Sequence, residues 1–451
     1  MPTAADTRLA LERDYRARTR RSAALHDEAR RYFPGGVTRS VTYHAPYPLS
    51  IADGCGCRLR DVDGNPYRDL LINFGAMIHG HAHPAIVSAI RDQLGRGTDY
   101  GAPTESHLQL AREIMRRVAS VERLRFTTSG TEAVLYAVRA ARAFTRRSKI
   151  LKMEGSYHGG YDSVSVSVDP GANAPEAPRG VVASAGLPPE VATNTLVAPF
   201  NDLNAVERIL HAHRADLAAV IVEPVTVRGM IPADGEFLRA LRELTRQLDV
   251  LLIVDEVVTF RLSEGGAQKR FGVTPDLTTF GKIIGGGLPV GAFGGRADIM
   301  SGFDPSHVPA VHHSGTFAGN NAVMAAGLAA LSLLNADAFD HLDMLGERLR
   351  HGLRAAARSA GFEAHVTGMG SLAALHLSAG PVRCYRDAVR TDRETMRWLH
   401  LALLNRGIFA RAGGSFFLST PMQTADVDET IVAVEGALKD VRPIYDSTRN
   451  G

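Results

Sequence analysis

Leu251-Leu252-Ile253-Val254-Asp255-Glu256-Val257 is an apolar run of strand length that ends abruptly in carboxylates. Such a continuous run is typical of a strand buried on both faces of a parallel sheet. Asp255 is therefore predicted at the carboxyl end of that strand, where open α/β sheets bind their ligands. Further along the chain, Lys282 stands in the glycine-rich segment Phe280-Gly281-Lys282-Ile283-Ile284-Gly285-Gly286-Gly287, where little else is bulky.

One fixed anion and one loosely packed lysine together indicate a cofactor. Pyridoxal phosphate (PLP) needs an Asp that holds a proton on its pyridine nitrogen and a Lys that forms a Schiff base. Asp255 and Lys282 supply that pair. Taken separately, each has an ordinary explanation, because an Asp at a strand end often caps the next turn and most lysines are solvated surface groups.

The composition sets broad limits on function. The chain has 451 residues, 45% of them hydrophobic, which favours two or three domains with a large core. A net charge of +3, from 51 basic and 48 acidic residues, gives no strong field for nucleic acid. Only three cysteines occur, so we expect a reducing compartment and a cytoplasmic protein. No apolar stretch approaches the roughly 20 residues of a membrane helix.

Strand and helix patterns alternate from about His83, as expected for a mostly parallel sheet flanked by helices. The predicted strands are 123–128, 150–153, 217–222 and 251–254, and the predicted helices are 132–145, 237–248 and about 324–334. A helix over 8–33 and short strands within 50–74 indicate a small lobe that the C-terminal third rejoins. The domains are therefore predicted as an N-terminal helix with part of the small domain (1–75), a large PLP-binding domain (76–334) and a C-terminal small α+β domain (335–451). The loop 170–199 is long enough to form a lid or a subunit contact.

Two short motifs fit the same cofactor. Ser129-Gly130-Thr131-Glu132 follows a predicted strand and begins a helix, so its hydroxyls and free N–H groups could hold a phosphate. A capping box of Ser129 and Glu132 is the alternative that needs no ligand. Tyr157 follows the next strand and could stack on a pyridine ring, although a Tyr at such a position more often only packs.

Other chemistries fit less well. An apolar strand that ends in Asp-Glu also resembles the magnesium-binding segment of P-loop ATPases, but the chain contains no G-x-x-x-x-G-K-[ST] motif. His79, His81 and His83 are spaced like metal ligands, but Gly80 and Pro84 indicate a loop, and no carboxylate or cysteine pair is near in sequence. We therefore expect no metal site.

The motifs in combination resemble the class III (ω-type) PLP-dependent aminotransferases of fold type I, in the branch that contains glutamate-1-semialdehyde aminomutase. The resemblance covers about Pro34 to Met422. It rests on Ser129-Gly130-Thr131-Glu132-Ala133, Glu154-Gly155-Ser156-Tyr157-His158-Gly159, Ile221-Val222-Glu223-Pro224-Val225, the Asp255 and Lys282 segments, and Ser314-Gly315-Thr316-Phe317. It implies an α/β fold with a large domain and a small α+β domain built from both termini.

The resemblance also implies roles for single residues. Lys282 would be the Schiff-base lysine and Asp255 the partner of the pyridine nitrogen. Tyr157 and Val257 would enclose the ring, and His158 and Glu223 would belong to the cofactor site. Ser129, Gly130 and Thr131 would form the phosphate cup, which Thr316 would complete from the other subunit of a homodimer.

Two arginines bear on the substrate. Arg39, in Pro34-Gly35-Gly36-Val37-Thr38-Arg39-Ser40, resembles the carboxylate-binding arginine of the β-phenylalanine aminotransferases. Arg411, in Ala410-Arg411-Ala412-Gly413-Gly414, resembles their mobile second arginine, which would bind the side-chain carboxylate of glutamate or 2-oxoglutarate. A surface ion pair is the ordinary alternative for either residue.

The expected activity is ping-pong transamination between a β- or other non-standard amino acid and a keto acid such as 2-oxoglutarate or pyruvate. Glutamate-1-semialdehyde 2,1-aminomutase activity is the first alternative. The aminomutase segment Asp-Glu-Val-x-Thr-Gly-Phe-Arg is one glycine shorter here, at Asp255-Glu256-Val257-Val258-Thr259-Phe260-Arg261, which argues against that alternative. A catalytically silent binding protein with the same fold is the alternative from another class.

Overall fold

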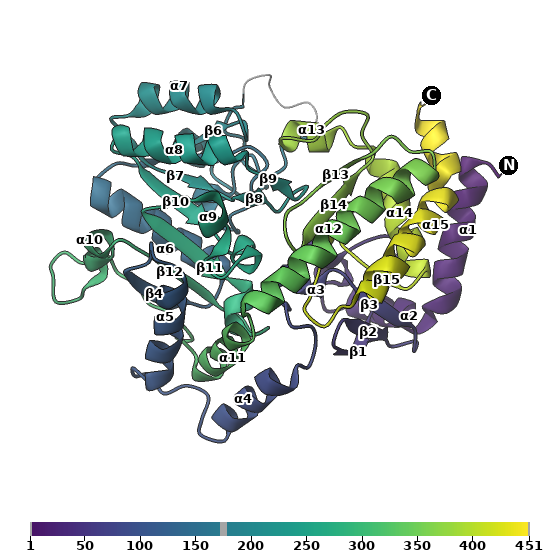
Figure 1. Cartoon of the computed structure of the whole chain (residues 1–451), viewed down its shortest axis with the longest axis horizontal. Coiled ribbons are helices and arrows are strands. Elements are labelled where there is room, and N and C mark those ends of the chain that lie inside the picture. The colour runs from purple at the N-terminus through teal and green to yellow at the C-terminus, as the bar shows by residue number, and fades with distance from the viewer. Residues whose placement is uncertain (1, 172–177, 450–451) are drawn as a thin grey trace.

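A seven-stranded sheet forms the centre of the larger half of the molecule in the computed structural model, which describes residues 2–171 and 178–449 (Figure 1). Its strands are β4 (Arg123–Thr127), β5 (Lys149–Met153), β6 (Thr195–Ala198), β7 (Leu217–Val222), β10 (Leu251–Asp255), β11 (Leu277–Gly281) and β12 (Gly291–Gly295). They lie in the order β4-β12-β11-β10-β7-β5-β6. β12 pairs antiparallel with both β11 and β4, whereas the other described pairs are parallel, so the sheet is mostly parallel, as predicted.

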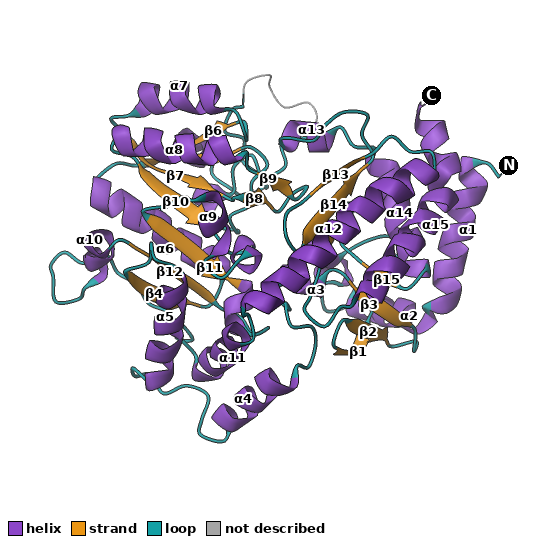
Figure 2. Cartoon of the chain, in the orientation of Figure 1, coloured by secondary structure: helices purple, strands orange, loops and turns teal. Residues whose placement is uncertain are grey.

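Helices cover both faces of this sheet (Figure 2). Alternate residues of β10 face opposite helices: Leu252 and Val254 pack with α8 (Gly235–Gln247), whereas Leu251 and Ile253 pack with α6 (Gly130–Thr145). A strand covered on both sides must be apolar throughout, which is the pattern that the sequence displays. The helices of this half are α4 (Pro84–Leu94), α5 (Glu105–Arg117), α6 (Gly130–Thr145), α7 (Leu203–His213), α8 (Gly235–Gln247), α9 (Gly266–Phe271), α10 (Ala297–Met300) and α11 (Asn321–Ser332).

The smaller half combines the two ends of the chain. β15 (Ile408–Phe409) pairs in parallel with β3 (Pro66–Asp69), which joins C-terminal and N-terminal segments in the sheet β1-β2-β3-β15. A second sheet has the order β13-β14-β16, and a two-stranded ribbon, β8 (Val225–Thr226) with β9 (Ile231–Pro232), lies near it (Figure 1). The other elements are β1 (Ile51–Cys55), β2 (Arg58–Asp61), β13 (His365–Thr367), β14 (Leu372–His376), β16 (Ser415–Phe417), α1 (Ala4–Arg18), α2 (Arg20–Ala29), α3 (Ile72–Gly75), α12 (Ala336–Ser359), α13 (Tyr385–Val389), α14 (Arg393–Asn405) and α15 (Thr424–Arg449).

Two local predictions were wrong. The helix expected over 8–33 is broken at Thr19, because the carboxylate of Asp63 accepts hydrogen bonds from the N–H groups of Arg21 (2.7 Å) and Ser22 (3.0 Å) and so begins a new helix, α2. The loop expected over 170–199 ends earlier, because β6 begins at Thr195 and pairs with β5. Residues 172–177 of that loop lie outside the described residues.

No single described helix is long and apolar enough to cross a membrane; α11 and α12 satisfy that test only as a pair, and the chain bends by 75° between them. We keep 1–75, 76–334 and 335–451 as proposed domain boundaries. The cofactor residues predicted from the sequence, apart from Thr316, lie at or near the strand ends and turns of the larger half, while the two substrate arginines come from the smaller half.

Candidate active site

Asp255 ends β10 and is 4% exposed. One carboxylate oxygen, Oδ2, accepts a hydrogen bond from Nδ1 of His158 at 2.7 Å. The other, Oδ1, accepts from the backbone N–H of Val257 and from the hydroxyl of Thr279, both at 3.0 Å. A carboxylate offers about four acceptor positions, so three donors fix its orientation and leave room for one more.

Glu223 follows β7 and holds two backbone segments beside Asp255. Its carboxylate accepts hydrogen bonds from the N–H groups of Tyr157 and Val227, each at 2.9 Å. Burial raises the pKa of Glu223, His158 opposes the rise and Asp255 adds to it. Glu223 therefore holds the backbone of Tyr157, whose own side chain is 48% exposed and free to contact a ligand.

Lys282 begins the short helix η6 (Lys282–Gly285) directly after β11, with φ of 50°. This left-handed backbone is costly for a residue other than glycine and is found mainly where function or packing demands it. Burial lowers the pKa of Lys282, Asp255 and Glu223 oppose that shift, and Arg411 adds to it. The amine is thus within electrostatic reach of both carboxylates and of the predicted substrate arginine.

A second lysine, Lys152 on β5, is also buried near the site. Its Nζ donates to the carbonyl oxygens of Ser156 (3.0 Å) and Val166 (2.5 Å). Burial lowers the pKa of Lys152 to about 7. Because its amine is already bound to two carbonyls, Lys152 stabilises the loop that carries Tyr157.

The predicted phosphate cup lies at the N-terminus of α6. The hydroxyl of Ser129 accepts from the N–H of Glu132 at 3.2 Å, whereas the carboxylate of Glu132 accepts from the N–H of Thr128 at 2.7 Å. The capping-box alternative is therefore only half present, because Glu132 bonds Thr128 and not the N–H of Ser129. The first N–H groups of a helix have no partner within it, so those of Gly130 and Thr131 remain available to an anion at its positive end. A Cβ atom on Gly130 would lie 2.9 Å from Cγ1 of Val257. The predicted phosphate cup therefore lies next to Val257, two residues after Asp255.

Thr316 lies apart from these residues, in the loop before α11, and is exposed, as is its neighbour Phe317 (64%). The structure brings Lys282, Asp255, His158, Glu223, Tyr157, Val257 and the Ser129–Thr131 segment together within one chain. Thr316 is the one predicted cofactor residue for which the described residues show no contact with that group.

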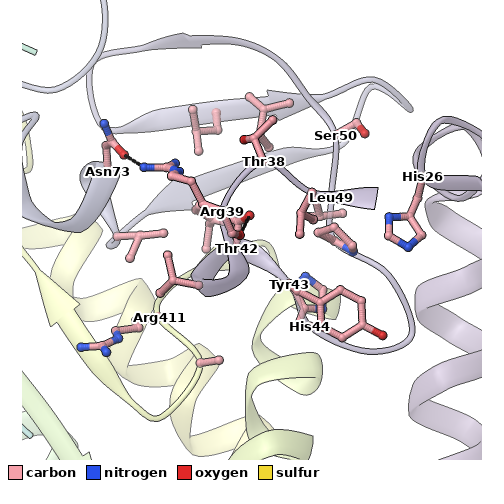
Figure 3. Close-up of a pocket in the computed structure, with 18 of the residues that line it drawn as sticks. His26, Thr38, Arg39, Thr42, Tyr43, His44, Leu49, Ser50, Asn73 and Arg411 are labelled. Carbon is pink, nitrogen blue, oxygen red and sulfur yellow. Dashed lines mark hydrogen bonds between the residues drawn. The ribbon is translucent and has the colours of Figure 1, made fainter. Parts of the chain in front are cut away.

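The two arginines line one cavity of about 620 Å³, between the segment 36–50, α3 and the turn after β15 (Figure 3). Nη1 of Arg39 donates to Oδ1 of Asn73 at 3.4 Å, and its guanidinium lies 5.7 Å from the ring centre of Phe74. Nη1 of Arg411 donates to the carbonyl of Val227 at 2.9 Å. Burial lowers the pKa of Arg411, and the nearby charge of Arg228 adds to that shift. Apolar side chains, among them Leu49, Leu71 and Phe409, form much of the remaining wall.

The three histidines of the segment 79–83 do not converge on one point. His79 bonds the hydroxyl of Thr420 and the carbonyl of Ala330, and His81 bonds Asp69. Within the described residues, no group of three His, Cys, Asp or Glu side chains is arranged to hold a metal ion.

Comparison with known proteins places this geometry in a family. The family model Aminotransferase class-III matches residues 40–427. The chain belongs to the class III aminotransferases. Glutamate-1-semialdehyde 2,1-aminomutase of Methanothermobacter thermautotrophicus is 41% identical over 427 residues, which cover 94% of this chain and 100% of that protein.

Solved structures of transaminases share the fold. An omega-transaminase from Sphaerobacter thermophilus is 44% identical, with a TM-score of 0.91, over 93% of this chain and 98% of that one. A beta-phenylalanine aminotransferase from Variovorax paradoxus is 37% identical, with a TM-score of 0.88, over 96% and 97%. A transaminase with PLP bound is 40% identical, with a TM-score of 0.87, over 94% and 98%. The chain is accordingly a PLP-dependent aminotransferase of fold type I.

The residues present fit that cofactor. Asp255 keeps an acceptor position beside three fixed donors, and Nε2 of His158 is buried without a hydrogen-bond partner among the described residues. A side chain at position 130 would occupy the space between Gly130 and Val257. PLP needs an anion, a lysine and an anion-binding helix terminus, and these three features lie together here.

Sequence reasoning missed Thr279 and Asn73. Thr279 reaches Asp255 because parallel pairing sets the two residues opposite each other on β11 and β10. Its position three residues before Lys282 was a usable signal once β11 was recognised as the next strand. Asn73, which has φ of 49° in a distorted turn, gave no such signal.

Proposed function

We propose that this class III aminotransferase transfers the amino group of a β- or other non-standard amino acid to a dicarboxylic keto acid such as 2-oxoglutarate, with pyruvate as the second candidate acceptor. The observation that carries the proposal is that Arg39 and Arg411 line one largely apolar cavity. Arg39 would hold the carboxylate common to all substrates. Arg411 would bind a second carboxylate and move aside for an apolar side chain.

The other residues would act as follows. Bound PLP supplies an electron sink at its protonated pyridine ring. Asp255, held by three donors, would keep the proton on the ring nitrogen, and Tyr157 and Val257 would enclose the ring. Ser129, Gly130 and Thr131 would bind the phosphate. Lys282 Nζ, whose pKa is lowered by burial, would take the proton from the substrate carbon that bears the amine and would deliver it to the cofactor carbon bonded to that amine.

The proposed assembly is a homodimer with sites at the subunit interface. Its support is the exposed loop before α11, where Phe317 is 64% and Val308 94% exposed, because large apolar side chains in such a loop suit a protein contact. Thr316 would then complete the phosphate cup of the partner subunit. Active monomers in sedimentation experiments would refute this arrangement.

The attachment site is tested by borohydride reduction of the holoenzyme followed by peptide mass spectrometry. The pyridoxyl group should be on Lys282, and Lys152 should be unmodified. Lys282→Ala should fold but lose nearly all turnover, whereas Lys152→Met should keep the label. A label on Lys152 would overturn the assignment.

The substrate class is tested by single-turnover measurement of each half-reaction. Arg39→Ala should impair both. Arg411→Ala should impair mainly the glutamate or 2-oxoglutarate half-reaction, by roughly ten- to a hundredfold, since a charge-assisted contact is worth about 1.5–3 kcal/mol. Equal losses of rate in both half-reactions of Arg411→Ala would refute the proposed movement of Arg411.

Aminomutase activity remains the second candidate because the curated relatives bear that name at 39% to 42% identity. Conversion of glutamate 1-semialdehyde to 5-aminolevulinate by the wild type, faster than any transamination of β-amino acids, would favour it. The absence of that conversion, together with turnover of a β-amino acid, would support the proposal.

A further inference from the structure

A second cavity, of about 590 Å³, is also lined by Arg411. Four arginines line it: Arg228 between β8 and β9, Arg393 and Arg397 on α14, and Arg411 itself. Arg411 also lines the substrate cavity, so the two spaces meet at this residue. The second cavity thus lies directly beside the residue that would bind the distal carboxylate of a dicarboxylic substrate.

The charges around this cavity do not balance. Asp169 is the only carboxylate among its described lining residues. Asp169 accepts a hydrogen bond from the hydroxyl of Tyr385 and pairs with Nη1 of Arg228 at 3.2 Å and Nη2 of Arg393 at 3.4 Å. Burial would raise the pKa of Asp169, but these partners outweigh burial and lower it, so the group is ionised. Among the described lining residues, one negative charge therefore faces four arginines.

Two of those arginines form no ion pair with a described residue, although the more distant charge of Glu223 acts on Arg411. Within residues 2–171 and 178–449, Arg397 forms no ion pair, and the side chain of Arg411 has only the neutral carbonyl of Val227 as a hydrogen-bond acceptor. Several arginine side chains line one cavity whose walls have a low dielectric constant. Such walls focus the positive electrostatic field of the arginines and raise the local concentration of anions. A structural ion-pair network would instead bring acids and bases in similar number.

We propose that this second cavity is an anion-binding vestibule that captures dicarboxylic substrates and passes the distal carboxylate to Arg411. The ligand class is a dicarboxylic 2-oxo acid with its matching amino acid. The inference rests on the proposed aminotransferase function and deepens it, because it selects 2-oxoglutarate over pyruvate as acceptor. Arg393 and Arg397 act in capture, since both are exposed and lie on one face of α14.

The test is steady-state kinetics of the holoenzyme with 2-oxoglutarate and with pyruvate, at low salt and at about 0.3 M salt. The double variant Arg393→Gln/Arg397→Gln should raise KM for 2-oxoglutarate about five- to tenfold and leave kcat within about twofold, because steering acts before chemistry. KM for pyruvate should change less than about twofold. In the wild type, salt should raise KM for 2-oxoglutarate more than KM for pyruvate, and the variant should lose that difference.

Arg208→Gln, a change at an exposed arginine on α7, is the matched control and should alter neither KM. An equal effect of the double variant on both acceptors, or no effect on 2-oxoglutarate, would overturn the vestibule. A fall in melting temperature with unchanged selectivity would likewise assign the arginines to stability alone.

A binding measurement separates this inference from the proposed function. Glutarate carries two carboxylates and no reactive carbonyl, and butyrate is its singly charged counterpart. Calorimetry should show glutarate binding to the wild-type holoenzyme and about five- to tenfold weaker binding to the double variant, with butyrate unaffected. If 2-oxoglutarate were not a substrate but glutarate showed this pattern, the function would fail and the vestibule would stand. Equal glutarate binding by both proteins would refute the vestibule.

Discussion

His158 is expected to support activity through Asp255. The perturbation is His158→Phe, which replaces the buried imidazole by a ring of similar size and removes the 2.7 Å hydrogen bond to Oδ2. Hydrogen bonds to charged groups contribute about 1.5–3 kcal/mol. The first half-reaction should therefore slow by roughly ten- to a hundredfold, because the Asp255 carboxylate loses one of the three donors that fix it.

The consequence follows from the orientation of that carboxylate. Asp255 can hold a proton on the cofactor nitrogen only while its free acceptor position points at the ring, so a less firmly held carboxylate should weaken the electron sink. His158→Asn is the matched control, since its amide can donate from nearly the position of Nδ1, and it should restore most of the wild-type rate.

The assay is the single-turnover rate of the first half-reaction, followed by the absorbance of the cofactor, with cofactor content measured for each variant. A variant that binds as much cofactor as the wild type still has an intact site. A rate within twofold of the wild-type rate in His158→Phe would refute the reasoning. It would show that Val257 and Thr279 suffice to hold the carboxylate of Asp255.

Three further predictions follow from other contacts. Gly130→Ala should weaken PLP binding about tenfold or more, because its Cβ would lie 2.9 Å from Val257 and such overpacking costs about 1–3 kcal/mol. The measurement is titration of the apoenzyme with PLP, and the control is Gly380→Ala, where a Cβ meets nothing within 4 Å. The free energy of unfolding should fall as the pH is lowered from 6.5 to 4. Burial lowers the pKa of His44, His79 and His376 to about 4, so in this range the unfolded chain binds protons at these residues and the folded chain does not. Each contributes about 3 kcal/mol of that dependence, and His376→Gln should reduce the slope of melting temperature against pH, while an unchanged slope would contradict the assignment. Phe317→Asp should dissociate the proposed dimer and release cofactor, as sedimentation and absorbance would detect, whereas a stable dimer with full cofactor would place the interface elsewhere.

Strand ends were the part of the site that sequence could predict. Asp255 ends an apolar run, which predicts a position at the carboxyl edge of a parallel sheet. Lys282 was predicted from its glycine-rich segment instead, because the strand before it, Leu277–Gly281, contains two threonines and was not predicted. Ser129 to Thr131 followed from the same rule for the turn after β4. The roles given to these residues stay predictions, but their proximity is confirmed by the contacts of Asp255, Val257 and Gly130.

What the sequence left open depends on tertiary contacts. β12 has the sequence Gly291-Ala292-Phe293-Gly294-Gly295, which lacks a strand's apolar pattern. It pairs antiparallel between β11 and β4 because glycine allows close approach: a Cβ on Gly291 would lie 2.0 Å from the carbonyl oxygen of Ser129. The break at Thr19 likewise depends on Asp63, more than forty residues away. Neither contact leaves a local signal.

The contrast between two arginines explains why Arg411 suits a movable role. Arg261 is fully buried and donates to Ser371 Oγ (2.8 Å), to the carbonyl of Gly75 (3.1 Å) and to the carbonyl of Leu418, so moving it would leave three acceptors without a donor. Arg411 has, among the described residues, one side-chain hydrogen bond, to the neutral carbonyl of Val227. A guanidinium has five N–H donors, so most of those of Arg411 are available to an arriving carboxylate. Only one hydrogen bond is lost when Arg411 moves aside for an apolar substrate side chain, so one residue can serve both halves of a transamination.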